Sequence, residues 1–271
     1  RIIVLLLIST GCPMILAAEG HVPVMTIFSA LLGGALVSGS AGVLNCIWDK
    51  DIDGIMNRTK NRPLPADRVS VEGAFLYSIF LFVLGVSLLA MQLNWLAASV
   101  AIFGHLFYVL IYTIGLKRSS VQNIVIGGAA GAVPPIVGWI GVTGRIDLEA
   151  ILLFLLIFLW TPPHFWALAI NKNQDYQRAG VPMMPVICGE AVTQRQMFWY
   201  ALALLPVTWL LVAVNPTLGN FSLVVLTLLS SAFAWKVHQL RQYVIPSAAT
   251  SEEMTQAKTK KAWDIFWFSI I

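Results

Sequence analysis

The chain of 271 residues is 58% hydrophobic and only 11% charged, and its formal net charge is +4. A soluble domain carries about a quarter charged residues, so this composition excludes an ordinary soluble protein and predicts a polytopic membrane protein. The positive net charge does not indicate nucleic-acid binding, because the Lys and Arg residues are placed as expected for the loops of a membrane protein.

Apolar runs long enough to cross a bilayer, which takes about 20 residues, recur along the chain. Because the chain starts without Met and ends within an apolar run, we expect a fragment that lacks a short N-terminal segment and the end of its last helix. The predicted fold is an all-α polytopic membrane helical bundle. We expect transmembrane helices at 2–18, 24–47, 71–91, 95–116, 122–142, 148–170, 197–214 and 219–236, with a ninth that begins near residue 262.

Lys and Arg residues are distributed asymmetrically over the loops between these spans. All of them except Arg145 fall on one side, that of the loops after the second, fourth, sixth and eighth spans. Positive residues favour the cytoplasmic side of a membrane. These four loops are therefore predicted to be cytoplasmic, which accounts for the basic balance without nucleic acid.

An acidic stripe follows the second span. Asn45, Asp49 and Asp53 recur every four residues, so on a continuing helix they share one face, with about 6 Å between successive positions. Oxygen-bearing side chains suit a hard cation, and Mg²⁺ usually shares such carboxylates with substrate phosphates. Asp51 lies about 200° around the helix from Asp49, so we expect it to face elsewhere as a solvated or structural charge.

A second acidic stripe follows the sixth span. Asn171 and Asp175 repeat the four-residue spacing, and the order of the spans places them on the same membrane face as the first stripe. Either stripe alone is typical of a solvated helix end. Two stripes on one side of a bundle favour Mg²⁺ ions that bridge a diphosphate, with basic residues neutralising the remaining charge.

Basic residues lie close to both stripes in the sequence. Arg58 and Arg62 follow the first stripe, and Lys172 lies within the second. Lys117 and Arg118 close the fourth span on the same face. Charges at the end of a span often need no further role, so the sequence leaves two interpretations of this last pair, an interfacial one and a phosphate-binding one.

Several motifs together resemble a known family. They are NxxxDxxxD, NRTKNRPLP, YTIGLKRSSVQN, GGAAGAVPPIVGW, TPPHFWALAI and DYQRAGVPMMPV. Over nearly the whole chain they resemble the haem O synthases, a branch of the UbiA-type intramembrane prenyltransferases; TPPHFW and AGVPMMPV are typical of the haem branch. The resemblance implies one UbiA-type domain over residues 1–271, with nine transmembrane helices around a central cavity open to the cytoplasmic face.

The resemblance also implies a reaction, the Mg²⁺-dependent transfer of farnesyl from farnesyl diphosphate to a vinyl group of haem B. Addition of water then gives haem O, which serves the haem-copper terminal oxidases. The implied catalytic residues are Asp49, Asp53 and Asp175, with Asn45 and Asn171 as further metal ligands. The implied diphosphate-binding residues are Arg58, Arg62, Lys117, Arg118 and Lys172. Many relatives have Asp where Asn171 stands, so the second metal site carries less charge here.

The partners and location implied by the resemblance are those of a membrane enzyme. Farnesyl diphosphate and haem B are the expected substrates, and the lipid bilayer surrounds the protein. A haem A synthase or terminal oxidase assembly factors are possible protein partners. The expected location is a bacterial cytoplasmic membrane or the mitochondrial inner membrane, with the active site toward the cytoplasm or matrix.

Two intramembrane histidines are candidates for haem binding. His164 lies in TPPHFW, and His105 lies in the fourth span. A lone histidine in a membrane helix is often a hydrogen-bonded core residue. Within the TPPHFW motif, contact of His164 with the haem iron or a propionate is the favoured interpretation, and His105 is a second candidate.

Three other functions remain open from the sequence. The first is a related prenyltransferase that uses an aromatic acid or a chlorophyllide as acceptor. The second is a transporter in which Asp49, Asp53 and Asp175 line an ion path. The third is a haem-binding scaffold without catalytic activity.

Overall fold

A computed structural model describes residues 2–242 and 251–270, and all regular secondary structure in these ranges is helical. The first helices are α1 (Ile2–Ala17), α2 (Val24–Trp48), α3 (Lys50–Ile55), α4 (Val71–Gln92), α5 (Trp95–Leu106) and the π-helix η1 (Phe107–Leu116). The remainder are α6 (Asn123–Gly131), α7 (Val133–Thr143), α8 (Leu148–Asn171), α9 (Asn173–Arg178), α10 (Met184–Ile187), α11 (Glu190–Val214), α12 (Asn220–Arg241) and α13 (Ser251–Phe268).

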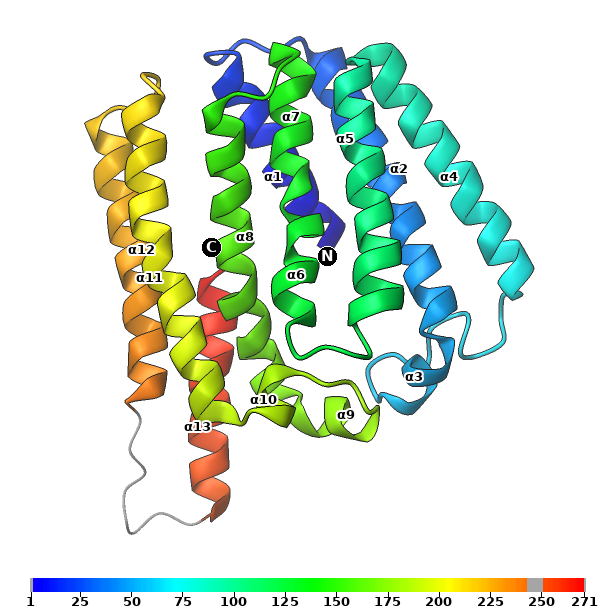
Figure 1. The fold of residues 1–271 in the computed structure, drawn as a ribbon, viewed down its shortest axis with the longest axis vertical. Coiled ribbons are helices and arrows are strands. Elements are labelled where there is room, and N and C mark those ends of the chain that lie inside the picture. The colour runs from blue at the N-terminus through cyan, green and yellow to red at the C-terminus, as the bar shows by residue number, and fades with distance from the viewer. Residues whose placement is uncertain (1, 243–250, 271) are drawn as a thin grey trace.

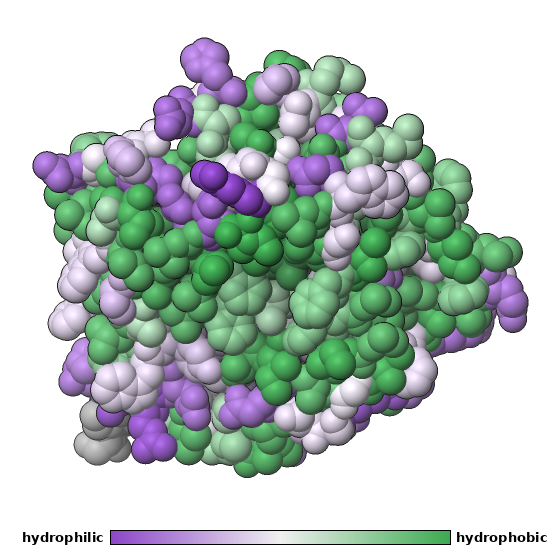
Figure 2. All heavy atoms as spheres, turned by 45° about the horizontal axis from the view of Figure 1, so that its top comes forward, coloured by the Kyte–Doolittle hydropathy of each residue, from purple (hydrophilic) through white to green (hydrophobic). Residues whose placement is uncertain are grey.

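Seven helical segments in the described part are long and apolar enough to cross a membrane. They include α5 continued by η1 and α6 continued by α7, while α1 is apolar but shorter. Hydrophobic side chains cover most of the face seen in Figure 2, and hydrophilic ones gather mostly toward its edges. The predicted all-α membrane bundle is confirmed, whereas the count of nine spans stays a prediction.

The helices differ from the predicted spans in several places, including the last two: α12 continues to Arg241 rather than residue 236, and α13 begins at Ser251 rather than near residue 262. The fourth span changes at Phe107 from an α-helix to the π-helix η1, and the fifth is interrupted at Ala132, just before the Pro134–Pro135 pair. The predicted start of the seventh span at residue 197 is wrong, because α11 begins at Glu190. Its first turns are charged and polar, so a criterion based on hydropathy finds only the apolar part of the helix.

The helices pack as adjacent pairs along the bundle. Helix α2 lies along α4, α1 along α7 and α8 along α11, and α13 packs against α8 and α12. In Figure 1, α11 and α12 form one side of the bundle and α2 with α4 the other, with α6, α7 and α8 between them. Small residues allow the closest approaches: a Cβ on Gly138 would come within 2.2 Å of the Thr10 carbonyl oxygen.

The non-spanning helices α3, α9 and α10 all lie at one end of the bundle (Figure 1). The short connection from η1 to α6 reaches the same end. The chain order predicted this arrangement, because an even number of spans separates the first acidic stripe from the second. This end of the molecule therefore gathers the polar sequence motifs.

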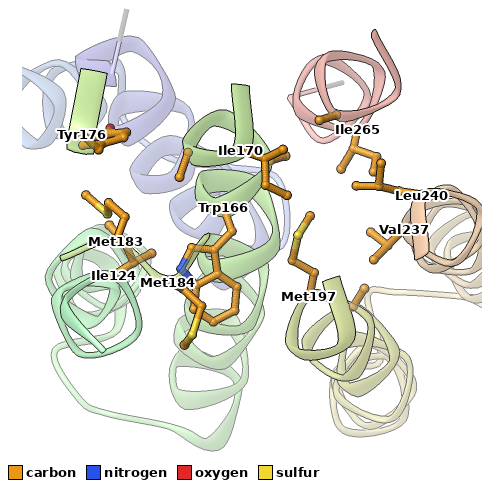
Figure 3. Close-up of a cluster of buried hydrophobic side chains, with 14 of the residues drawn as sticks. Ile124, Trp166, Ile170, Tyr176, Met183, Met184, Met197, Val237, Leu240 and Ile265 are labelled. Carbon is orange, nitrogen blue, oxygen red and sulfur yellow. The ribbon is translucent and has the colours of Figure 1, made fainter. Parts of the chain in front are cut away.

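A core of buried hydrophobic residues supports this polar end. Figure 3 shows Trp166 of α8 near Ile124 of α6, with Met183 and Met184 from the segment after α9 around them. Tyr176 of α9 packs into the same core and is only 2% exposed. Burial of an aromatic side chain stabilises packing by a few kcal/mol, so α9 is held firmly on the bundle.

Candidate active site

The first acidic stripe lies where α2 meets α3. The predicted continuous helix is interrupted here, because Asp49 ends α2 with φ −94° and ψ 9° and α3 starts at Lys50. The backbone bonds nevertheless continue at four-residue spacing, from Asp49 N to Asn45 O (2.9 Å) and from Asp53 N to Asp49 O (2.8 Å). The three side chains thus form one stripe, which is called here the first acidic site.

All three residues of the first acidic site are buried. Asn45 is 8% exposed, Asp49 is 0% exposed and Asp53 is 4% exposed. The Asn45 amide nitrogen lies 2.9 Å from Oδ2 of Asp49 and 3.2 Å from the Thr113 hydroxyl. A buried carboxylate is costly unless it is paired, so these two aspartates need cationic partners.

The partners are basic residues that the sequence singled out. The Lys117 ammonium contacts Oδ2 of Asp49, and Arg118 lies 3.4 Å from Oδ1 of the same carboxylate. Arg62 forms an ion pair of 2.7 Å with Asp53. Lys117 is thus more than an interfacial charge, since it reaches a carboxylate that is fully buried.

Asp51 faces away from the stripe, as its helical position predicted. It is paired with Arg118, which donates 2.6 Å and 2.7 Å hydrogen bonds to its two oxygens. These bonds hold the pKa of the Asp51 carboxyl below its ordinary value. Arg118 also donates to the Trp48 carbonyl over 2.7 Å, so it fastens the end of α2 to the end of η1.

The π-helix η1 brings the fourth span onto the first acidic site. Its wider turn closes with a bond from Lys117 N to Tyr112 O, five residues back (2.8 Å). Thr113 and Lys117 both reach α2 as a result. Gly127 of α6 makes room for this helix, because a Cβ there would come within 2.2 Å of the Tyr112 ring. Departures from α-helical geometry of this kind are frequent at functional sites.

The second acidic stripe, Asn171 and Asp175, lies at the junction of α8 and α9. Asp175 accepts a 2.5 Å hydrogen bond from Arg178 and has 13% of its side chain exposed. Asn171 donates to the Ala167 carbonyl, and its own amide oxygen is buried without a hydrogen bond in the described part of the chain. Lys172 lies over α13, with its ammonium 5.8 Å from the Trp263 ring centroid.

One contact joins the segment that follows the first stripe to α9, which carries Asp175 of the second stripe. Arg58, beyond the first stripe, donates a 3.0 Å hydrogen bond to the Tyr176 phenol oxygen. Its guanidinium lies 5.1 Å from the centroid of the same ring. This contact brings two segments 118 residues apart onto one side of the bundle end.

The first acidic site has the chemistry that Mg²⁺ prefers. Its donors are two carboxylates and an amide. Among the described residues, no three or more His, Cys, Asp or Glu side chains lie together as a complete metal site. Mg²⁺ is usually held by one or two carboxylates together with substrate phosphates and water. Asp49 and Asp53 therefore fit a metal that is shared with a diphosphate.

The two candidate histidines contact different helices. His105 is buried, with Nδ1 3.3 Å from the Val37 carbonyl oxygen of α2 and its ring 4.5 Å from Phe82 of α4. His164 is partly buried and contacts Ser269 beyond α13. The structure accounts for His105 by helix packing, whereas the environment of His164 leaves its second ring nitrogen without a hydrogen bond in the described residues.

Two functional residues had no role assigned from the sequence. Thr113 contacts Asn45, and Tyr176 contacts Arg58. Thr113 lies four residues before Lys117, so on a helix the two side chains are on nearly the same face, and this spacing could have indicated Thr113 once Lys117 was a candidate. Nothing local in the sequence indicates the pairing of Tyr176 with Arg58, because it depends on how α9 folds back over the bundle.

An apolar helical bundle with buried carboxylates and basic side chains at one end is typical of an intramembrane prenyltransferase. The chain belongs to the UbiA prenyltransferase family, with a match over residues 4–256. The predicted family is confirmed.

The chain is about 50% identical to curated relatives that are named protoheme IX farnesyltransferase. The protein of Rippkaea orientalis is 48% identical over 242 residues, covering 89% of this chain and 75% of the relative. That of Synechococcus sp. strain JA-3-3Ab is 51% identical over 242 residues, covering 89% and 72%. That of Trichodesmium erythraeum is 51% identical over 240 residues, covering 89% and 73%.

Solved structures share the fold at low sequence identity. A UbiA homolog from Aeropyrum pernix K1 superposes with a TM-score of 0.74 at 16% identity, covering 100% of this chain and 95% of that one. A UbiA homolog from Archaeoglobus fulgidus, bound to DMAPP and Mg²⁺, gives a TM-score of 0.67 at 13% identity, covering 98% and 94%. These likenesses establish the arrangement of helices as that of the UbiA fold.

Proposed function

We propose that this protein transfers farnesyl from farnesyl diphosphate to a vinyl group of haem B, with addition of water, to make haem O. The observation that carries the proposal is the pair of buried carboxylates, Asp49 and Asp53, each ion-paired with basic side chains at the end of an apolar bundle. The names of the relatives at about 50% identity support farnesyl as the donor group and haem as the acceptor.

The first acidic site would hold the diphosphate end of the donor. Mg²⁺ bound by Asp49 and Asp53, with Asn45 beside them, would neutralise charge that develops on the departing pyrophosphate. The A. fulgidus homolog with the same fold is bound to DMAPP and Mg²⁺, which is consistent with a prenyl diphosphate and Mg²⁺ as ligands here. The C–O bond of the allylic diphosphate breaks with its electron pair on pyrophosphate, and the surrounding apolar helices would shelter the allylic cation from water.

The ion pairs of the site are well suited to an exchange of partners. Arg62 and Lys117 neutralise Asp53 and Asp49 in the structure. With Mg²⁺ held by Asp49 and Asp53, Arg62 and Lys117 would be free to pair with the phosphate oxygens, with Arg118 beside them. Each buried carboxylate is thus paired with a cation in the structure, and with Mg²⁺ on the carboxylates the basic side chains would pair with phosphate oxygens instead, so no buried charge would lack a partner of opposite sign.

The second acidic stripe, Asn171 and Asp175, would contact the same diphosphate from the junction of α8 and α9. Asp175 is the candidate metal ligand, and the buried amide oxygen of Asn171, which lacks a hydrogen-bond partner, is a further oxygen donor of no charge. Arg58 is held toward α9 by Tyr176. Lys172 packs over Trp263, so a phosphate contact would require its side chain to swing away from α13.

The acceptor half of the site is assigned to the bundle interior. The terminal carbon of a haem vinyl group would form the new bond to farnesyl, and water would add to the neighbouring carbon with loss of a proton. We propose His164 as the haem contact, with His105 as a second candidate. The product would serve haem-copper oxidases directly or through a haem A synthase, in a bacterial cytoplasmic or mitochondrial inner membrane.

A parallel acceptor assay tests this function. The full-length protein is given farnesyl diphosphate and Mg²⁺ with either haem B, 4-hydroxybenzoate or a chlorophyllide, and the products are identified by mass spectrometry. We expect farnesyl transfer to haem B only. Transfer to the aromatic acid or the chlorophyllide but not to haem would contradict the proposal, as would haem binding without any Mg²⁺-dependent product.

A further inference from the structure

His164 of α8 is enclosed on both ring faces by aromatic side chains. The Trp160 ring lies 4.3 Å away at an interplanar angle of 18°, and the Phe266 ring of α13 lies 4.6 Å away at 22°. Because both rings are nearly parallel to the imidazole, another flat group has no face on which to stack. The remaining approach is in the ring plane, along the direction of a nitrogen lone pair.

Every polar group of Ser269 has a partner. Its N–H donates to Ile265 O (3.0 Å), its carbonyl accepts from Trp160 Nε1 (2.9 Å), and its hydroxyl donates to Phe266 O (2.7 Å). A serine hydroxyl has one proton and two lone pairs. Since that proton goes to Phe266, the 2.6 Å contact with His164 Nδ1 requires the imidazole to donate.

This assignment fixes the tautomer of His164. A neutral imidazole carries one N–H, so a proton on Nδ1 leaves Nε2 with a free lone pair. Nε2 makes no hydrogen bond in the described part of the chain. Histidines that bind metals characteristically donate the other ring N–H to an acceptor, which sets the ring orientation and raises the basicity of the ligating nitrogen.

We propose that Ser269 holds His164 as the Nδ1–H tautomer so that Nε2 ligates the iron of the metalloporphyrin substrate. Ser269 is then a positioning residue, and Trp160 with Phe266 sets the plane of the ring. The inference rests on the proposed function for the presence of haem B in the bundle.

Comparing a porphyrin that contains iron with one that does not distinguishes ligation of the iron by His164 from packing of the porphyrin ring. The full-length protein in detergent is titrated with ferric haem B and, separately, with iron-free protoporphyrin IX, and absorption spectra report binding. His164→Ala should remove the imidazole-ligated haem spectrum. Ser269→Ala should raise the Kd for haem B about 10- to 100-fold, as expected for loss of a group that orients a metal ligand. It should leave the Kd for protoporphyrin IX unchanged, because that molecule offers no iron.

Two further variants serve as controls. Ser269→Thr keeps the hydroxyl and should restore haem binding. Ser78→Ala removes a buried serine in α4 with the same local bond, from its hydroxyl to the Phe75 carbonyl over 2.7 Å, and should bind both porphyrins like the wild type.

The outcomes distinguish this inference from the proposed function. The inference is wrong if Ser269→Ala weakens both porphyrins equally, or if His164→Ala keeps the ligated spectrum and loses only turnover. Farnesyl transfer to haem in a protein whose haem spectrum does not depend on His164 also contradicts the inference, while the proposed function stands. Ligation through His164 without any farnesyl transfer supports the inference and contradicts the function.

Discussion

The Arg58 guanidinium donates to the Tyr176 phenol oxygen over 3.0 Å and so joins the loop after α3 to α9. Burial raises the pKa of the Tyr176 phenol, which therefore remains a neutral acceptor at physiological pH. The ring also packs into the core beneath the polar end of the bundle. One side chain thus couples the segment that follows the first stripe to the helix that carries Asp175 of the second.

Tyr176→Phe should weaken the binding of farnesyl diphosphate while the protein stays folded. The substitution keeps the buried ring and removes only the acceptor for Arg58. Loss of one hydrogen bond of about 1 kcal/mol predicts a rise of about fivefold in KM, with a smaller change in kcat. Tyr77→Phe, on the exposed face of α4, is the control and should have no effect. An unchanged KM in Tyr176→Phe would show that Arg58 does not act on the diphosphate.

Asp49→Asn and Asp53→Asn should each lower farnesyl transfer by at least about 100-fold, the scale seen when a group that stabilises transition-state charge is removed. Both replacements keep the size of the side chain, so the protein should remain in the membrane. Asp67→Asn is a suitable control: Asp67 is exposed, pairs with Lys50, and has a positive φ of 51° that Asn tolerates. Substantial residual activity in both stripe variants would refute the metal role.

Lys117→Gln should change two affinities in opposite directions. Lys117 occupies an oxygen of Asp49, so its removal should raise the affinity for Mg²⁺ alone. The same change removes a phosphate partner and should lower the affinity for farnesyl diphosphate. We expect the Kd for Mg²⁺ to fall about tenfold and the Kd for farnesyl diphosphate to rise about tenfold, each equivalent to about 1.4 kcal/mol. Isothermal titration with each ligand measures both. Lys50→Gln, which removes an exposed charge, should change neither, and a parallel fall of both affinities in Lys117→Gln would contradict the exchange of partners.

Much of the fold could be predicted because its signals are local. Hydropathy marked the spans, and four-residue spacing placed Asn45, Asp49 and Asp53 on one face although α2 ends at Asp49. The number of spans between the two stripes placed the Asn171 stripe at the same end of the bundle. Hydropathy and residue spacing depend only on the chain within a few helical turns, and the span count follows from the hydropathy.

The rest of the site depends on contacts between distant segments. The π-helix η1 forms where Gly127 leaves room for Tyr112, and it is this geometry that brings Thr113 to Asn45. The contact of His164 with Ser269 spans 105 residues. No local pattern indicates such pairs, so the sequence indicates the lysines and histidines but not the side chains that orient them.

Asp147→Asn probes the opposite end of the bundle through its pH dependence. A hydrogen bond from the Trp139 indole, with a further one from Arg145, holds the pKa of the Asp147 carboxyl below its usual value. Because the folded-state pKa is lowered, this stabilisation is present above the unfolded-state pKa of about 4 and is lost as the pH falls through the folded-state value.

The variant should therefore be less stable than the wild type by about 1 kcal/mol at pH 7, and thermal unfolding scans should show the gap shrinking below about pH 4. Glu149→Gln, in the first turn of α8, is the control. A gap that persists undiminished at low pH would mean that the charge of Asp147 does not contribute.

Mass spectrometry of haems from cells that express the full-length protein, in a strain without its own haem O, measures the proposed farnesyl transfer itself. We expect a new haem species that carries a farnesyl group and one added water, and we expect this species to be absent from cells that express Asp49→Asn. If cells with the wild-type protein contain only haem B and accumulate a prenylated aromatic compound instead of haem O, haem is not the acceptor.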